Sequence, residues 1–224
     1  GEAELLKDDL FRIYSMTKPV TAVAIMQLYE QGKFNLNDPV SKFLPELEDL
    51  KVLNEDGDLE SISTTMRMHH LLTHTAGVTY GFSNDQVDIQ YSNADLFLSE
   101  NLDDFVNRVA KLPLKFQPGT RYHYSIAVDL TGLIIERLSG QSLDKYFSEN
   151  IFKPLGMKDT FFQVPEDKIN RFLTRYRYDQ KTKYPVEFPA TPNQAMDDFI
   201  NVSMFSGGGG LVSSAMDYMI FAET

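Results

Sequence analysis

The longest apolar patterns in the chain predict two buried helices. Apolar side chains recur with a period near 3.6 over residues 14–31, and Gly32 follows where a helix usually ends. Residues 127–139 carry a similar pattern, and it ends at Gly140. The first of these helices is expected to begin at or just after Ser15, which lies at the edge of its apolar stripe.

Shorter patterns predict the connecting elements. Turn residues in the middle of 51–65 indicate an exposed turn or a small hairpin, and aromatic and β-branched residues in 160–188 favour strands or extended loops. Ser214, followed three residues later by Asp217, is typical of the capped start of a helix. We also expect helical segments over 37–43, 68–73, 102–112 and 142–152, the last closed by Pro154-Leu155-Gly156, a polar loop over 84–91 and a turn over 116–119.

Composition and charge narrow the class of protein. A chain of 224 residues with 42% hydrophobic content can bury a substantial core, and we interpret residues 1–224 as a single domain. The net charge of -11 would repel phosphate backbones, so nucleic acid is not an expected partner. No segment approaches the roughly 18 to 20 apolar residues of a membrane span. Because the chain has no cysteine, any covalent catalysis must use a hydroxyl, a carboxylate or an amine.

One short motif carries such chemistry. Ser15 and Lys18 form a Ser-x-x-Lys tetrad at the start of the first apolar helix, and a spacing of three brings both side chains to one helix face. A serine hydroxyl becomes a good nucleophile when a neighbour accepts its proton, and a neutral lysine amine can do so. The free N–H groups of a helix N-terminus can also stabilise a developing oxyanion. The alternative is a helix-capping serine followed by a solvated lysine.

Two other patterns give only weak evidence for a metal site or a phosphate-binding loop. His70 and His74 have the i, i+4 spacing of paired metal ligands, but no third ligand is evident and no glutamate follows His70. The glycine run 207–210 lacks the Gly-Lys-Ser/Thr ending of a phosphate-binding loop. We therefore expect neither a metal nor a cofactor.

Six segments, in order, resemble one family. The nucleophile segment FRIYSMTKPVTA at 11–22 resembles that of the serine β-lactamases and penicillin-binding proteins, especially the class C and family VIII esterase branch. The resemblance covers nearly the whole chain. The other matching segments are GKFNLNDPV at 32–40, LLTHTAG at 71–77, PGTRYHYS at 118–125, PLGM at 154–157 and GGGGLVS at 207–213.

The resemblance implies further site residues. In this family the tyrosine of a Tyr-x-Asn loop moves protons at the nucleophile, and Tyr124 matches it, with Tyr122 as a rival. Ile126 stands where the family has an asparagine that binds substrate amides, which favours esters over β-lactams or peptides. Ile126, Gly208 and Gly209 are the expected substrate-binding residues.

The resemblance also implies an α+β fold of the β-lactamase/transpeptidase type. Family members have two strands before the nucleophile helix and three near their end. No strand is evident before Ser15 and no Lys/His-Thr/Ser-Gly motif follows Gly210, so we expect mainly the helical domain, with the five-stranded antiparallel sheet missing or incomplete. That sheet also provides one of the two N–H groups of the family's oxyanion hole.

The expected function is a serine hydrolase that forms an acyl-enzyme on Ser15, acting on short-chain esters as a carboxylesterase. The alternatives are β-lactamase or D-alanyl-D-alanine peptidase activity, or an inactive family member that serves as a binding or assembly module. The expected partner is a small ester or amide substrate. Oligomeric state has no signal in the sequence.

Overall fold

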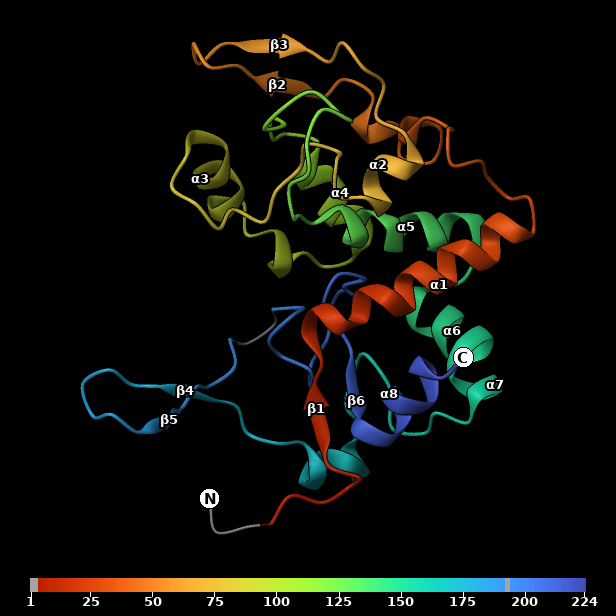
Figure 1. The fold of residues 1–224 in the computed structure, drawn as a ribbon, viewed down its shortest axis with the longest axis vertical. Coiled ribbons are helices and arrows are strands. Elements are labelled where there is room, and N and C mark those ends of the chain that lie inside the picture. The colour runs from red at the N-terminus through yellow and green to blue at the C-terminus, as the bar shows by residue number, and fades with distance from the viewer. Residues whose placement is uncertain (1–3, 192–193) are drawn as a thin grey trace.

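The computed structural model describes residues 4–191 and 194–224, and two lobes of these residues meet at the long helix α1 (Figure 1). One lobe holds α2 to α5 and the β2–β3 hairpin, and the other holds β1, β6 and α6 to α8. The α-helices are α1 (Thr17–Glu30), α2 (Met68–Leu72), α3 (Gln86–Asn93), α4 (Leu102–Val109), α5 (Ala127–Ser139), α6 (Leu143–Phe147), α7 (Lys153–Leu155) and α8 (Ala215–Ala222). Short 3₁₀ helices cover Tyr14–Met16, Val40–Lys42, Pro45–Leu47, Leu96–Leu98 and Glu166–Arg171, and a π-helical turn covers Ser148–Phe152.

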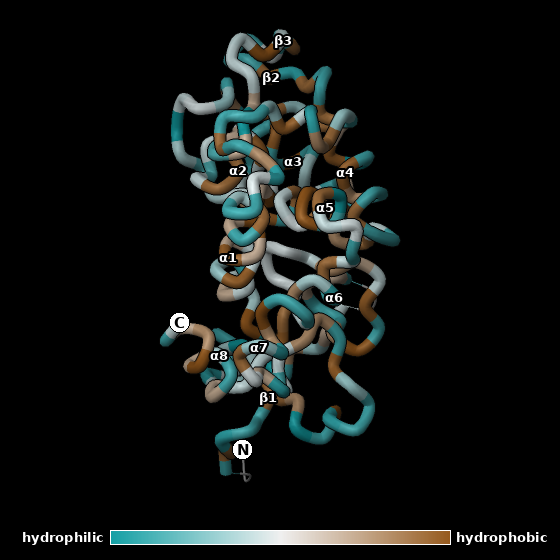
Figure 2. Tube along the Cα trace, turned by 90° about the vertical axis from the view of Figure 1, so that its right-hand side faces the viewer, coloured by the Kyte–Doolittle hydropathy of each residue, from teal (hydrophilic) through white to brown (hydrophobic). Residues whose placement is uncertain are grey.

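Helices α1 and α5 form the centre of the core, as the apolar patterns predict. Figure 2 shows α5 coloured as hydrophobic over most of its length, beside α1. Every residue from Ala127 to Ile135 is buried. Gly140 ends α5 in the left-handed conformation, with φ +70°, which a glycine adopts without steric cost. None of the described helices is long and apolar enough to cross a membrane.

The sheets among the described residues are three antiparallel strand pairs. Strand β1 (Leu10–Arg12) pairs with β6 (Val212–Ser214), so that Leu10 lies opposite Ser214 and Arg12 opposite Val212. The expectation that no strand precedes Ser15 is therefore wrong, because the partner of β1 lies about 200 residues away in sequence and leaves no local signal. The other pairs are β2 (Lys51–Leu53) with β3 (Leu59–Ser61), and β4 (Tyr176–Tyr178) with β5 (Pro185–Glu187).

One other prediction from local sequence is wrong. Residues 84–91 are not a loop, because Asp85 caps α3 by accepting hydrogen bonds from the N–H groups of Val87 and Asp88.

The helical segment predicted over 142–152 ends within Pro154-Leu155-Gly156, as expected. Pro154 lies in the first turn of α7, where the missing N–H is tolerated, and the chain turns at Gly156, with φ +73°.

The hairpin over 51–65 and the strands within 160–188 are confirmed by β2–β3 and β4–β5. Ser214 caps α8 as expected, since its Oγ accepts a hydrogen bond from the Asp217 N–H at 3.1 Å. The Asp217 carboxylate has another role. It accepts hydrogen bonds from the Asp159 N–H at 2.6 Å and the Thr160 hydroxyl at 2.9 Å, and so holds the segment after α7 against the start of α8.

Gly77 should tolerate replacement by alanine less well than Gly32, another glycine with a positive φ. It has φ +91°, and a Cβ added there would lie 2.5 Å from the Phe116 carbonyl oxygen. We expect Gly77→Ala to lower the free energy of unfolding by about 2–4 kcal/mol in urea denaturation. Gly32→Ala is the control, because Gly32 has φ +69° but nothing within 4 Å of the added Cβ, so its loss should be roughly 1 kcal/mol. Equal losses would contradict the steric explanation.

Candidate active site

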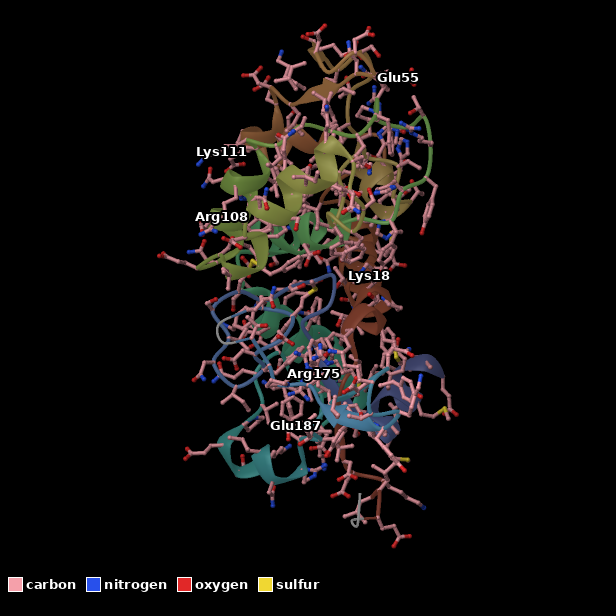
Figure 3. The ribbon with its side chains drawn as sticks, turned by 90° about the vertical axis from the view of Figure 1, so that its left-hand side faces the viewer. Lys18, Glu55, Arg108, Lys111, Arg175 and Glu187 are labelled. Atoms are coloured by element: carbon pink, nitrogen blue, oxygen red, sulfur yellow. The ribbon has the colours of Figure 1, made fainter. Side chains whose placement is uncertain are left out.

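Ser15 lies in the 3₁₀ turn that leads into α1, at the junction of the two lobes. Its Oγ accepts a hydrogen bond from the Tyr124 hydroxyl at 2.6 Å and lies 3.3 Å from Lys18 Nζ. Figure 3 shows Lys18 at this junction. The structure thus brings together Ser15, Lys18 and Tyr124, the three residues that the sequence marks as catalytic candidates. Tyr122, the rival of Tyr124, is 67% exposed, and its ring lies against His74.

Lys18 is held by two further oxygens. Its Nζ donates to the Gly208 carbonyl oxygen at 2.7 Å and to the Tyr80 hydroxyl at 3.0 Å. The amine also lies 4.6 Å from the centre of the Tyr124 ring. A helix on one side and the glycine segment on the other therefore fix the amine beside Ser15.

A buried carboxylate supports this arrangement. Asp129, on α5, has no exposed surface, and it accepts hydrogen bonds from the Gly208 N–H at 3.0 Å and from the Ser206 hydroxyl. Tyr80 OH donates to its second oxygen at 3.4 Å. Burial raises the pKa of Asp129, against the opposing effects of these hydrogen bonds and of Lys18. Burial, reinforced by the Asp129 charge, also raises the pKa of Tyr80, so that its phenol stays protonated.

The segment with Tyr124 is positioned by His74. The Ser125 N–H donates to His74 Nδ1 at 3.2 Å, and the His74 ring lies 4.9 Å from the Tyr124 ring. An imidazole nitrogen that accepts a hydrogen bond carries no proton. Burial, with a smaller effect of the Lys18 charge, lowers the pKa of His74 to about 4, which keeps the ring neutral.

A cavity of about 400 Å³ opens above Ser15. Arg175 holds one wall of the cavity, because its guanidinium donates to Tyr14 OH at 3.1 Å and to the Phe188 carbonyl oxygen at 2.9 Å, and pairs with Asp197. Figure 3 shows Arg175 in the lobe below Lys18. Much of the lining is aromatic or apolar, namely Tyr14, Tyr80, Phe82, Tyr124, Phe188 and Met196.

The expected substrate-binding residues occupy different places. Gly209 lines the cavity, whereas Gly208 lies beneath it and contacts Lys18 and Asp129. Ile126 is fully buried in the core at the start of α5, and it is not among the residues that line the cavity.

The two histidines that share metal-ligand spacing have separate partners. His70 Nδ1 accepts a hydrogen bond from the Arg67 N–H at 3.1 Å, while His74 faces Ser125. Among the described residues no cluster of histidine, aspartate and glutamate side chains is arranged to hold a metal ion.

Sequence reasoning missed Tyr80, Asp129 and Arg175. For Asp129 a signal was present, because a carboxylate interrupts an otherwise apolar stretch of the predicted helix over 127–139. Tyr80 lies 62 residues from Lys18 in sequence, and nothing local marks it as a partner of the amine.

Comparison with known proteins shows the family of the chain. The family model described as Beta-lactamase matches residues 4–224. The chain belongs to this family. The resemblance of the sequence to serine β-lactamases, penicillin-binding proteins and their esterase relatives is thereby confirmed.

Several members of the family are similar over nearly the whole chain. Protein Rv1367c of Mycobacterium tuberculosis is 38% identical over 222 residues, which are 97% of this chain and 54% of that protein. Esterase EstB of Burkholderia gladioli is 34% identical over 230 residues, 95% of this chain and 56% of the esterase. The chain thus spans about half the length of the curated relatives it matches.

A solved structure of the family supports the fold. Simvastatin synthase (LovD) from Aspergillus terreus superposes with a TM-score of 0.81 at 26% identity, over 97% of this chain and 54% of that chain. The expected β-lactamase/transpeptidase-like fold is confirmed in partial form, mostly helical and with only small sheets among the described residues.

The neutral state of His74 predicts a pH effect on stability. Its pKa is lower in the folded chain than the ordinary value of 6.5, so the stability it contributes is present above about pH 6.5 and is lost as the pH falls toward 4. We expect His74→Asn to lose less stability than the wild type between about pH 7 and pH 5 in urea denaturation. Asparagine suits the left-handed backbone at this position, where φ is +54°. Identical losses in the two proteins would exclude His74 as the source.

Proposed function

We propose that this chain carries the catalytic centre of a serine acyl hydrolase that forms an acyl-enzyme on Ser15. The observation that carries the proposal is the contact of Ser15 Oγ with both Tyr124 OH, at 2.6 Å, and Lys18 Nζ, at 3.3 Å, beneath an open cavity. A hydroxyl within reach of two groups that can move its proton is the arrangement needed for nucleophilic catalysis. The family relationship and the printed name of Esterase EstB support the same class of reaction.

The reaction proceeds in two steps. In the first, Ser15 Oγ attacks the ester carbonyl carbon and passes its proton to the neutral Lys18 amine, and the resulting oxyanion lies near the start of α1. The tetrahedral intermediate then collapses. The bond to the alcohol breaks, and Tyr124 gives that alcohol a proton and takes one from Lys18. In the second step water attacks the acyl-enzyme, and the same groups remove its proton and return one to Ser15 Oγ.

The cavity supports esters with apolar groups as substrates. Aromatic side chains on several sides, among them Tyr14, Phe82 and Phe188, favour an uncharged acyl or alkyl chain over a peptide amide. Ile126 supplies no amide-binding group to the cavity, because it is buried and does not line it. We therefore propose a carboxylesterase that acts on short-chain esters.

Covalent labelling tests the proposal directly. A fluorophosphonate probe should add one label to the peptide that contains Ser15, and Ser15→Ala should abolish the labelling, as read by mass spectrometry. Lys18→Ala should lower ester turnover by about 10² to 10⁴-fold, the usual effect of losing a general base. Ser92→Ala, which changes an exposed serine on α3, is the control and should react as the wild type does. Labelling that persists in Ser15→Ala would reject Ser15, and an unreactive wild type would favour a binding or assembly module.

Substrate preference provides a second test. p-Nitrophenyl acetate and butyrate should be hydrolysed with a higher kcat/KM than a cephalosporin or a D-alanyl-D-alanine peptide, because the cavity wall offers more apolar surface than amide partners. Phe82→Ala should lower kcat/KM for the butyrate ester more than for the acetate, since the 80% exposed Phe82 ring is available to a longer chain. Faster hydrolysis of the cephalosporin would favour the β-lactamase alternative.

A further inference from the structure

The hydrogen bonds around Lys18 constrain where its lone pair can point. Lys18 Nζ has three oxygen neighbours, the Gly208 carbonyl at 2.7 Å, Tyr80 OH at 3.0 Å and Ser15 Oγ at 3.3 Å. A protonated amine offers three N–H groups, whereas the neutral amine that can act as a base has two N–H groups and one lone pair. The Gly208 carbonyl can only accept, so one N–H must point to it. The direction of the hydrogen bond between Tyr80 and Lys18 then decides whether the lone pair of the amine points to Tyr80 or to Ser15.

Asp129 sets that direction. Burial raises the pKa of Asp129, but the hydrogen bonds from Ser206 and Gly208 and the Lys18 charge favour its ionised form. In that form the carboxylate only accepts hydrogen bonds, so the single hydrogen of the Tyr80 hydroxyl points to Asp129 Oδ2. The lone pairs of that hydroxyl are left facing Lys18, and the amine must direct its second N–H there. Deprotonation of Tyr80 would break this order, but burial and the Asp129 charge both raise its pKa.

We propose that Tyr80 and Asp129 are positioning residues that aim the lone pair of the neutral Lys18 amine at Ser15 Oγ. This inference rests on the proposed function, in which Lys18 takes the proton of Ser15. With two N–H groups held by Gly208 and Tyr80, the remaining tetrahedral direction of the nitrogen faces the serine. Tyr80 and Tyr124 then differ in role, since Tyr124 contacts Ser15 Oγ itself and Tyr80 acts through Lys18.

Packing alone does not require a charge at position 129. Asparagine has the same shape, and its carbonyl oxygen can accept from the Ser206 hydroxyl and the Gly208 N–H as the carboxylate does. The buried carboxylate instead costs stability. Its pKa is raised on folding, so its contribution to stability is present at acidic pH and is lost as the pH rises through the folded value.

The variant Asp129→Asn separates the packing role of this side chain from its role in orienting the Tyr80 hydroxyl. Its amide nitrogen would face Tyr80 and donate to it. The Tyr80 hydrogen would then point to Lys18, and the Tyr80 oxygen would no longer accept an N–H of the lysine amine. We expect Asp129→Asn and Tyr80→Phe each to lower kcat for p-nitrophenyl butyrate, and the rate of fluorophosphonate labelling of Ser15, by about 10²-fold, with KM changed less than about threefold. The melting temperature of Asp129→Asn should equal or exceed that of the wild type.

A double variant tests whether Asp129 acts through Tyr80. If it does, Tyr80→Phe with Asp129→Asn should be no slower than Tyr80→Phe alone by more than about twofold, because the carboxylate has nothing left to orient. Two matched controls are available. Tyr91→Phe removes a buried phenol in α3, Asp217→Asn removes a buried carboxylate in α8, and both variants should retain the wild-type kcat.

The outcomes distinguish this inference from the proposed function. If Ser15 is labelled and Ser15→Ala is inert, but Asp129→Asn and Tyr80→Phe react at the wild-type rate, the positioning roles are wrong and the hydrolase stands. Losses that multiply in the double variant, or a fall in the melting temperature of Asp129→Asn, would also overturn the inference. A wild type whose Ser15 takes no label and which hydrolyses no ester would reject the proposed function itself.

Discussion

The backbone N–H and carbonyl groups of Gly208 make the two contacts on which the rest of the site depends. Its N–H binds Asp129 on α5, and its carbonyl binds Lys18 on α1, so a single residue joins the two central helices. The packing leaves no room for a side chain, because a Cβ at Gly208 would lie 2.3 Å from the Asp129 carboxylate. The glycine here is therefore required by close approach of the backbone. Gly208 thereby fixes the lysine amine on α1 relative to the buried carboxylate on α5.

The helices and the loops supply different groups to the site. Helices α1 and α5 supply the rigid groups, Lys18 and Asp129, while the loops supply Tyr80, Tyr124 and the aromatic walls of the cavity. A rigid element suits the proposed role of Lys18 as proton acceptor, because small displacements at a reacting centre lower the rate. The loops carry the surfaces that meet a substrate, and Arg175 ties one of them to Tyr14 beside the nucleophile. In the proposed reaction, proton transfer and substrate selectivity thus depend on different parts of the fold.

Local sequence signals predict the helix ends, but they do not predict contacts between residues that lie far apart in the chain. Gly32, Gly140 and Ser214 were predicted at helix ends because caps and left-handed turns depend on nearby residues. The same reasoning misread 84–91, where polarity concealed a helix with an Asp85 cap. Ser15 and Lys18 were found together because one helix turn joins them. Strand β1 and the Tyr80 contact were not found, since each depends on a partner far away along the chain.

The span of sequence that separates these partners also bears on the order in which the protein is made. Ser15 and Lys18 are synthesised before their partners, since Gly208 lies 190 residues after Lys18 and Tyr80 and Tyr124 lie between them. A nascent chain that ends before the glycine segment can form α1 but cannot hold the lysine amine in its final orientation. Long-range contacts of this kind form late, after the loops between them have closed. The environment of Ser15 is therefore completed only when segments far along the chain have folded against α1.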